Sequence, residues 1–490
     1  MNMSKTLLFH DEARRKLVEG VKTLYRAVSC TLGPKGRNVI LQEGYYPHVT
    51  KDGVSIAKSV VLRDRFMNMG CELVKNASIK TCEDAGDGTT TSVVLANALI
   101  NSGIKYLKEG HNPNDLNKGI DFAVKYVVDY IKSTALDVND ERIRQIATIS
   151  ANNDEEIGNL VADAFIRVTK NGVVSIESAK GSETTVEYVD GLQIDRGYMS
   201  PYFITDAEEM KCEMTNPYIL CYKGKLNSLS EILFSLETAV QQGRPILLIV
   251  DDIDSMALET LVMNKVKNQL NLCVIKSPFD SEYFSNLCVM IGADPKEHSM
   301  GSADKVIVTK TNTSIINGHG DPEEMYDLTV NMKDPVMLAK LTSGAAIIRV
   351  GAASEIEMLE KKDRIEDALC AVRAASEEGI VAGGGFTYLM GMLHIPVCTS
   401  HSEQPGGDIV IEALDAPFKQ ICQNAGLDSE KLLKEVISRK VGFNAKTERF
   451  SDLIEDGVID PAKVSRVALE NAASVAKMFL TTECVVVENG

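Results

Sequence analysis

A glycine-rich turn that opens directly onto a helix sets the strongest constraint on how this chain can fold. Residues 85–91 read Ala-Gly-Asp-Gly-Thr-Thr-Thr, and residues 92–100 form a nearly continuous run of small and apolar side chains. A helix that begins at such a turn presents unpaired backbone N–H groups and the positive end of its dipole to whatever lies in front of it. The stretch therefore predicts an anion site, most naturally for phosphate, although an ordinary capped helix would use the same residue types.

The side chains of this turn fit a metal-bound phosphate. Gly86 and Gly88 carry no Cβ and let the backbone approach a ligand closely, and the threonine hydroxyls at 89–91 can add hydrogen-bond donors. Asp87 supplies a hard carboxylate oxygen of the kind that a phosphate-bound Mg²⁺ prefers. The turn is not a Walker motif, so the string alone leaves both a nucleotide site and an ordinary capped helix open.

The size and charge of the whole chain exclude several classes of protein. With 490 residues, the chain is longer than one hydrophobic core usually serves, and about three domains are expected. The net charge of −17 argues against nucleic acid or an anionic membrane as the main partner. There is no apolar run of about 18 residues and no signal peptide at the start, so we expect a cytoplasmic protein. The 11 cysteines have no C-x-x-C spacing, which indicates reduced thiols.

Two further loops near the start of the chain combine glycine with polar side chains. A helix predicted over 13–30 is broken by residues 31–37, Thr-Leu-Gly-Pro-Lys-Gly-Arg, which precede a strand-like segment at 38–41. Residues 50–55, Thr-Lys-Asp-Gly-Val-Ser, place an acidic residue beside a glycine. Each loop is an ordinary turn when taken alone, but together with the loop at 85–91 the first could close the other side of a phosphate.

These loops, in this order and at these separations, resemble the nucleotide pocket of the group I chaperonins, the GroEL-type 60 kDa family. Further strings typical of the family follow in the family's order along nearly the whole chain. The chain is therefore identified as a divergent member of that family. The strings that carry the resemblance are residues 31–39, 50–55, 85–91, 148–152, 195–203, 364–369, 377–385, 460–461 and 481–484.

The resemblance implies a multidomain α/β chaperonin fold with three parts. The residues themselves support one of these parts, because they predict a strand, a helix and a second strand between 245 and 275, which is a βαβ unit. The three parts would be a mostly helical, ATP-binding equatorial domain (1–132 and 378–490), a hinged intermediate domain (133–189 and 346–377) and an α/β apical, substrate-binding domain (190–345).

The resemblance also implies roles for residues of the nucleotide pocket. Asp87 matches the family's Mg²⁺ ligand. Asp367 matches the acid that orients the attacking water, with Asp52 as a second acidic contributor near the γ-phosphate. Lys51 matches a position whose carbonyl lies near the phosphates and a bound K⁺, and Asp460 matches the ribose-binding acid. The other residues implied to bind ATP are Thr31, Leu32, Gly33, Pro34, Gly88, Thr89, Thr90 and Thr91 at the phosphates, Gly384 on the nucleoside side, and Asn444, Ala445 and Lys446 at the adenine.

Asp367 is an acid whose position the residues alone leave open. On a helix it projects about 200° away from Ile365, which with Leu369 and Val372 forms the expected buried face. This geometry alone favours a solvated surface acid. In the family this helix swings onto the nucleotide, so the resemblance implies that water is activated only in a closed state.

A second predicted activity is the binding of non-native protein. Apolar residues spread round most of the helix predicted after residue 254, so this helix is either buried, which the residues alone favour, or exposes apolar side chains to a partner. The resemblance implies the second: a groove that takes unfolded chains or the mobile loop of a GroES-type co-chaperonin, over an aromatic floor. The groove residues would be Leu233, Leu236, Leu258, Val262 and Met263, and the floor residues Tyr198, Tyr202 and Phe203.

Several departures from the family pattern lie outside the phosphate loops. The segments 292–301 and 327–334 are short, a glycine-rich turn is missing before Gly442, and Lys446 replaces a small apolar residue. From these changes and the net charge of −17 we expect monomers, single rings or other small oligomers, with slow ATP turnover. Three functions stay open: an ATP-driven folding chaperone, a binding or structural protein that no longer cycles, and, less favoured, a small-molecule ATPase or kinase.

Overall fold

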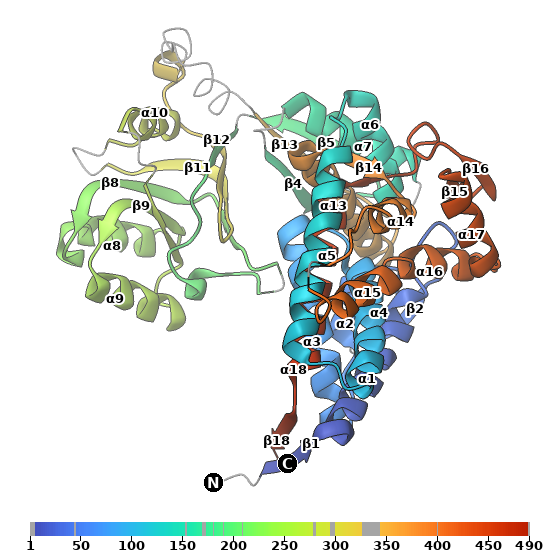
Figure 1. Cartoon of the computed structure of the whole chain (residues 1–490). Helices are drawn as coiled ribbons and strands as arrows, with labels where there is room; N and C mark the ends of the chain where they lie inside the picture. The colour runs from blue at the N-terminus through green and yellow to red at the C-terminus, as the bar shows by residue number, and fades with distance from the viewer. Residues whose placement is uncertain are drawn as a thin grey trace. The chain divides into compact units, whose positions relative to one another are not determined.

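The computed structural model of the chain divides into two compact units, each described here by itself (Figure 1). The first unit comprises Met1–Asp163 and Ala352–Gly490, and the second comprises Ala164–Gly351. The expected division into three domains stays a prediction. The short segment 327–334 lies outside the residues that the structure describes, as does part of 292–301. The described residues are 5–43, 46–151, 154–168, 173–179, 181–189, 191–207, 209–277, 281–294, 299–325, 344–398 and 400–488.

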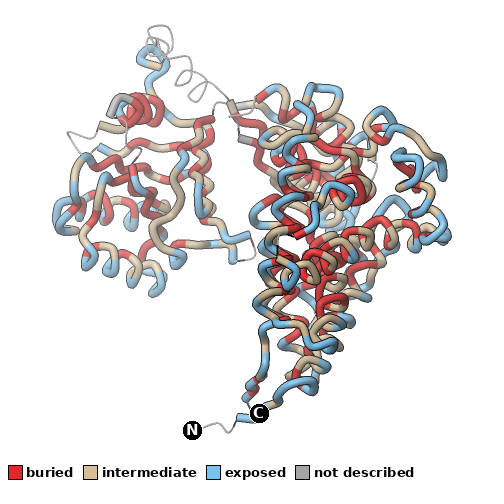
Figure 2. The backbone as a smooth tube through the Cα atoms, in the orientation of Figure 1, coloured by how far each residue is buried: buried red, intermediate tan, exposed pale blue. Residues whose placement is uncertain are grey.

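Helices from distant parts of the sequence build the core of the first unit. In α1 (His10–Ser29), the predicted apolar stripe is buried at a spacing of three to four residues. α18 (Ala462–Thr481) is buried along most of its length and packs against α3 (Arg65–Ala85), α4 (Thr89–Lys108) and α5 (Pro113–Thr134). Figure 2 shows buried and exposed stretches alternating along these helices. Segments that lie hundreds of residues apart therefore share one core.

The starts of these helices differ in how they are capped. The side chains of Asp52, Asp64 and Asn112 accept hydrogen bonds from the first backbone N–H groups of α2 (Gly53–Ser59), α3 and α5. The N-cap of α4 is Gly88, which adopts a left-handed conformation (φ 89°) and has no side chain to accept such a bond. Of these four helices, α4 alone begins without a capping side chain.

Two of the antiparallel ribbons in the first unit carry exposed apolar residues. β1 (Lys5–Phe9) pairs with β18 (Cys484–Glu488), so residues near both ends of the described chain lie side by side (Figure 1). β2 (Val39–Glu43) pairs with β3 (Tyr46–Thr50). Each ribbon carries an exposed apolar pair directly across its two strands. These pairs are Leu7 with Val486, and Ile40 with Val49.

α13 (Glu355–Glu378) is the long helix that carries Asp367. It contacts α6 (Asp140–Ser150), α18 and β17 (Ile459–Pro461). Ion pairs along its length hold it against α18 and connect it to Asp154. They are Arg364 Nη1 with Asp154 at 3.0 Å, Lys463 with Glu377 at 2.6 Å and Arg466 Nε with Glu378 at 3.0 Å.

The chain reaches Gly442 through a short connection, as its shortened sequence predicts. The helix before it ends at Arg439, and Lys440 adopts a left-handed conformation (φ 52°) that turns the chain into a strand. The remaining elements of this unit are α7 (Glu155–Val168, which continues into the second unit), β14 (Ile380–Ala382), α14 (Phe386–Met392), α15 (Gln404–Ala413), α16 (Ala416–Asn424), α17 (Ser429–Arg439), β15 (Gly442–Asn444) and β16 (Arg449–Ser451).

The second unit is built on a seven-stranded sheet of order β10-β9-β8-β11-β12-β6, with β7 beside β11. The predicted βαβ unit is confirmed: β9 (Ile246–Ile253) and β10 (Leu272–Lys276) are parallel and joined by α9 (Ser255–Val266). No helix among the described residues is long and apolar enough to cross a membrane. The other elements of the second unit are β6 (Gly191–Ile194), η1 (Pro201–Phe203), β7 (Cys212–Thr215), β8 (Tyr218–Leu226), η2 (Leu229–Glu231), α8 (Leu233–Gln241), α10 (Ser281–Ile291), β11 (Gly301–Val308), β12 (Thr313–Gly318), and a three-stranded sheet of β4 (Val173–Ser178), β13 (Ala345–Val350) and β5 (Thr185–Val189).

Candidate functional site

One cavity of about 350 Å³ in the first unit gathers every residue that the sequence predicts to bind nucleotide. It is lined by the starts of α2 and α4, the loop after α1, the middle of α13, and strands β15 and β17. The structure therefore brings together residues from four distant parts of the sequence, and their individual roles stay predictions. The predicted residues in its wall are Thr31, Leu32, Gly33, Pro34, Lys51, Asp52, Asp87, Gly88, Thr89, Thr90, Thr91, Asp367, Gly384, Asn444, Ala445, Lys446 and Asp460.

The start of α4 forms one end of this cavity and suits an anion. Because the N-cap is Gly88, no capping side chain accepts hydrogen bonds from the first-turn N–H groups at 89–91, which point outward along the helix axis. The carboxylate of Asp87 accepts a hydrogen bond from the Gly88 N–H at 2.5 Å, which holds it beside the helix start. An anion here would act as the cap of α4 and would meet the positive end of its dipole.

The hydroxyl of Thr89 supplies an independent observation that fits a ligand. Thr89 is buried, and its Oγ1 has no hydrogen-bond partner within the described residues. Such a buried, unpaired hydroxyl costs about 1–3 kcal/mol, which a phosphate oxygen or a metal-bound water would offset. The neighbouring loops are packed closely around it: Thr90 Oγ1 lies 3.4 Å from Thr31 Oγ1, and a Cβ at Gly53 would lie 2.4 Å from Thr90 Oγ1.

The turn before α4 is packed directly against α13. Gly86 adopts φ 76°, and an added Cβ at this position would lie 2.4 Å from the Cβ of Cys370. A glycine is required both by the left-handed backbone and by this close approach. Cys370 lies nearly one turn beyond Asp367 on α13, so its close contact with Gly86 also fixes the position of Asp367 relative to the start of α4.

Four carboxylates line the cavity: Asp52, Asp87, Asp367 and Asp460. Burial raises the pKa of Asp367 well above its ordinary value, and repulsion by Asp87 and Asp52 adds to the shift. Burial likewise raises the pKa of Asp87. The hydrogen bond from the Gly88 N–H lowers this pKa in part, and the charge of Asp52 raises it further. The pKa of Asp460 rises to about 6 through burial and the charge of Asp87. Several pKa values shifted together in one cavity by burial and mutual repulsion are typical of a functional site.

Replacing Asp460 by asparagine is expected to stabilise the nucleotide-free chain near pH 7. Since the folded state holds the Asp460 proton to about pH 6 and the unfolded state releases it near its ordinary pKa of 3.8, stability falls as pH rises through that window. The free energy of unfolding should rise by about 1–2 kcal/mol near pH 7, which is less than the full pKa shift implies because the cavity admits water. The difference between the variant and the wild-type chain should vanish near pH 4. The urea unfolding midpoint, measured against pH without nucleotide or Mg²⁺, checks this.

Asp456 offers a matched control for that measurement. It is an exposed acid four residues before Asp460, and hydrogen bonds from Ser451 and Asn444 lower its pKa. Its contribution is therefore present at neutral pH and lost as the pH falls, so Asp456→Asn should lower stability near pH 7. Effects of the same sign in the two variants would contradict the account given for the cavity.

Asp52 and Asp367 reach the cavity in different ways. The carboxylate of Asp52 accepts hydrogen bonds from Val54 N at 2.9 Å and Ser55 N at 2.6 Å, so its position is fixed by its role as the cap of α2. Asp367 is half-buried in the cavity wall. The residues alone favour a solvated surface acid, and this expectation is wrong. The predicted role of Asp367 in orienting water remains a prediction.

The other end of the cavity is formed around β15. The side chain of Asn444 is engaged in the turn that follows: Oδ1 accepts from Lys446 N at 3.0 Å and Thr447 N at 3.2 Å, and Nδ2 donates to Asp456 at 3.0 Å. Contact between Asn444 and a base would therefore come mainly from its backbone. Lys446 is exposed, so its charge is not buried in the pocket. At Gly384 (φ 63°), an added Cβ would meet nothing closer than 3.9 Å, which leaves room for a ligand.

Sequence reasoning missed part of the wall. Ile421 and Phe443 line the cavity, but an apolar residue gives the same sequence signal whether it faces the core or a ligand. Asp363, which does not itself line the cavity, was not predicted either. It lies one turn before Asp367 on α13, and its pKa is raised to about 6 by burial and by Asp52. The spacing of two acids at i and i+4 on one helix could have indicated it.

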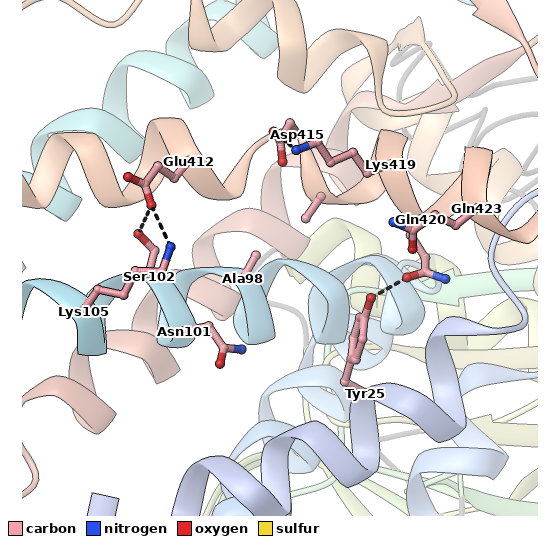
Figure 3. A pocket seen from close by; sticks show the side chains of 11 residues that line it. Tyr25, Ala98, Asn101, Ser102, Lys105, Glu412, Asp415, Lys419, Gln420 and Gln423 are labelled. Atoms are coloured by element: carbon pink, nitrogen blue, oxygen red, sulfur yellow. Dashed lines mark hydrogen bonds and ion pairs between the residues drawn. The ribbon is translucent and has the colours of Figure 1, made fainter. Parts of the chain in front are cut away.

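A second cavity of about 240 Å³ lies on another face of α16 (Figure 3). Pro417 and Ile421 line the first cavity, whereas Lys419 and Gln420 line the second. Several of its polar groups pair with one another, and no predicted site residue lines it. The pairs are Ser102 with Glu412 at 2.6 Å, Lys419 with Asp415 at 2.9 Å, and Tyr25 with Gln420.

The predicted polypeptide-binding residues lie in the second unit on or near η1, α8 and α9, and η1 contacts α9. Their exposure differs. Several exposed apolar neighbours were not among the predicted residues, and the largest are Phe234 (81% exposed) and Met256 (77%). Of the predicted residues, Tyr202, Leu233 and Met263 are exposed, and Tyr198, Leu258 and Val262 are half-buried.

Two of the predicted contact residues belong to the core instead. Phe203 is fully buried and Leu236 is 8% exposed, both within the apolar core of the seven-stranded sheet. The structure has a 3-10 turn followed by Ile232 at φ −117°, and only then α8. On α8, Leu236 and Ala239 are buried in this core, whereas Leu233, Phe234 and Val240 are exposed.

The fold and the cavity together define a chaperonin. The chain matches the TCP-1/cpn60 chaperonin family over residues 24–489, and it belongs to that family as a divergent member. Its fold is accordingly the multidomain α/β chaperonin fold. Chaperonins assist the folding of other proteins, so this chain is a folding chaperone, and a purely structural role is not favoured.

The chain is also similar to a solved phage protein. The chaperonin gp146 from the bacteriophage EL 2 (Pseudomonas aeruginosa) was crystallised in the presence of ATP-BeFx in two crystal forms. Crystal form II matches with a TM-score of 0.73 at 20% identity, and crystal form I with a TM-score of 0.68 at 21% identity. Each match covers 99% of both chains, so the whole fold is shared.

Proposed function

We propose that this chaperonin binds ATP in the cavity of the first unit and hydrolyses it to drive cycles of polypeptide binding and release. The observation that carries the proposal is the meeting, in one cavity, of the uncapped start of α4 and a group of carboxylates. The helix start and the buried Thr89 hydroxyl suit phosphate oxygens. The phage chaperonin was crystallised with ATP-BeFx, which supports nucleotide binding by this fold.

The carboxylates suit the cations that accompany ATP. Asp87 would hold Mg²⁺, which neutralises phosphate charge when bound. The carbonyl of Lys51 would contact K⁺. Binding of a cation at Asp87 removes part of the repulsion that raises the pKa of Asp367. The ionised Asp367 can then accept a hydrogen bond from the attacking water, while Asp52 stays fixed by its bonds to α2.

The exposed apolar side chains of α8 and α9 would hold non-native polypeptide. Leu233, Phe234, Met256 and Met263 are all exposed, and flexible methionines adapt to varied partners. A GroES-type co-chaperonin would compete for the same side chains. Tyr202, 68% exposed on η1, would extend this surface because η1 contacts α9.

Assembly of subunits would use two of the ribbons of the first unit. β1 with β18, and β2 with β3, are each two-stranded among the described strands, so each leaves strand edges open to a further strand. Their exposed cross-strand pairs add apolar area that a neighbouring subunit can cover. A ring of identical subunits would close such contacts, although the net charge of −17 on each subunit opposes it.

A combined turnover and refolding measurement tests this function. The purified chain should hydrolyse ATP only with Mg²⁺, and ATP should raise the recovered activity of a chemically denatured reporter enzyme above its spontaneous yield. ADP in place of ATP is the control, because it should support binding without turnover. An equal rise in yield with ADP would indicate a holding protein that does not cycle, and no Mg²⁺-dependent hydrolysis would refute the proposal.

A further inference from the structure

A hydrogen-bonded cluster in the second unit, outside the cavity described above, has the arrangement of an activated serine. Ser302 and Asp304 lie two residues apart on β11, so their side chains share one face of the sheet. His319 directly follows β12, whose last residue pairs with Ala303 of β11. The His319 N–H donates to the Ser302 carbonyl at 3.0 Å, which fixes the imidazole beside both side chains.

The distances within this cluster connect all three groups in series. His319 Nδ1 lies 2.9 Å from Ser302 Oγ, and His319 Nε2 lies 2.9 Å from Asp304 Oδ1. The second oxygen of Asp304 accepts a hydrogen bond from Asn317 Nδ2 at 2.6 Å. A nucleophile within reach of a base, with the base oriented by a third group, is the constellation of nucleophilic catalysis.

The hydrogen bonds also determine where the protons lie. Hydrogen bonds from Asn317 and His319 lower the pKa of Asp304, so its carboxylate is ionised and can only accept. His319 Nε2 must therefore carry the proton of the neutral ring, which leaves the lone pair on Nδ1. The hydroxyl of Ser302 then donates to Nδ1, as a serine does to its general base. In the usual triad Nε2 faces the serine and Nδ1 faces the acid, whereas here Nδ1 faces Ser302 and Nε2 faces Asp304. The histidine still lies between the serine and the acid.

A cation lies on the same face of the sheet. Tyr218 of β8 is paired directly with Ser302 of β11, so their side chains are neighbours. The Arg244 guanidinium stacks over the Tyr218 ring at 3.8 Å. Ser302 is half-buried and His319 is exposed, so a small molecule can reach the cluster. The positive charge favours a substrate that carries an anionic group.

We propose that Ser302 is a nucleophilic serine that accepts acyl groups from small esters bearing an anionic group. Ser302 Oγ forms a bond to the carbonyl carbon while its proton passes to His319, and the ester C–O bond breaks as that proton is given to the departing alkoxide. Water then hydrolyses the acyl-serine by the same route and releases the carboxylic acid. Asp304 acts as a positioning residue, because it holds the imidazole and stabilises its protonated form.

Acylation by 4-nitrophenyl hemisuccinate tests this assignment on the full chain. We expect release of nitrophenolate together with a succinyl group on the peptide that contains Ser302, identified by mass spectrometry. Ser302→Ala should abolish that label. His319→Gln, which retains the nucleophile, should slow acylation by about 10²-fold. Ser314→Ala on β12 is the matched control, because Ser314 is also half-buried in this sheet but lies outside the cluster, and the variant should keep the wild-type rate.

The anionic preference has its own readout. Arg244→Gln should slow acylation by the hemisuccinate ester more than acylation by neutral 4-nitrophenyl acetate. An acylation rate at Ser302 that is unchanged in His319→Gln, or no faster than that of other surface serines, would overturn the proposal. Equal effects of Arg244→Gln on the two esters would overturn the substrate class.

Discussion

Replacing Asp367 by asparagine is expected to slow ATP hydrolysis by about 10²-fold while leaving ATP affinity nearly unchanged. Asparagine keeps the size of the side chain in the wall of the cavity but cannot act as the acceptor that an ionised carboxylate provides. The residue lies on α13, and no bond to phosphate is assigned to it. Steady-state turnover and calorimetric binding of ATP with Mg²⁺, compared with the wild-type chain, measure the two quantities separately.

Two other carboxylates make this comparison sharp. Asp87→Asn should instead weaken binding of Mg²⁺ and ATP, because Asp87 sits at the start of α4. Asp363→Asn is the matched control: it removes a charge one turn earlier on the same helix, from a residue that does not line the cavity. It should alter hydrolysis far less than Asp367→Asn. An equal loss of ATP affinity in the Asp87 and Asp367 variants would contradict the division of roles.

Replacing Leu236 by serine is expected to destabilise the second unit by about 3 kcal/mol, because it empties a core position and buries a hydroxyl. Met263→Ser provides the contrast. Met263 is 52% exposed on α9, so its loss should cost less than about 1 kcal/mol but should weaken capture of unfolded polypeptide. Urea unfolding midpoints and the suppression of aggregation of a denatured reporter enzyme check both variants.

The opposite pattern would assign these side chains differently. A Leu236→Ser variant with wild-type stability would show that Leu236 leaves the core in solution, as the sequence had suggested. A large loss of stability in Met263→Ser, with capture unchanged, would show that α9 does not present a binding surface.

The sequence predicts elements whose signals are local. The helix predicted over 13–30, which the structure has at His10–Ser29, and the βαβ unit predicted between 245 and 275 both follow from periodicity and end signals within a few residues. The faces of α8 could not be predicted in the same way. Leu233 and Leu236 are neighbours on this helix, yet Leu233 is exposed and Leu236 is buried, and the spacing of apolar residues does not distinguish the two.

The candidate site shows the same limit at longer range. The start of α4 could be recognised as an anion site from seven consecutive residues, because its chemistry is local. The placement of Asp367 depends on the contact between Gly86 and Cys370, which are far apart in sequence. The residues alone therefore favoured solvent for Asp367, and only the resemblance to a family pointed to the cavity.

The first unit is made of two stretches of the chain that are separated by the second unit, and this affects how the chain folds as it is synthesised. The second unit is a continuous segment, Ala164–Gly351, and can complete its sheet while later residues are still being synthesised. The first unit cannot, because α18 packs between helices formed nearly four hundred residues earlier. We expect the parts of α3, α4 and α5 that α18 covers to remain exposed until residues 462–481 have been synthesised. A protein that folds others would thus spend most of its own synthesis as an incomplete, aggregation-prone chain.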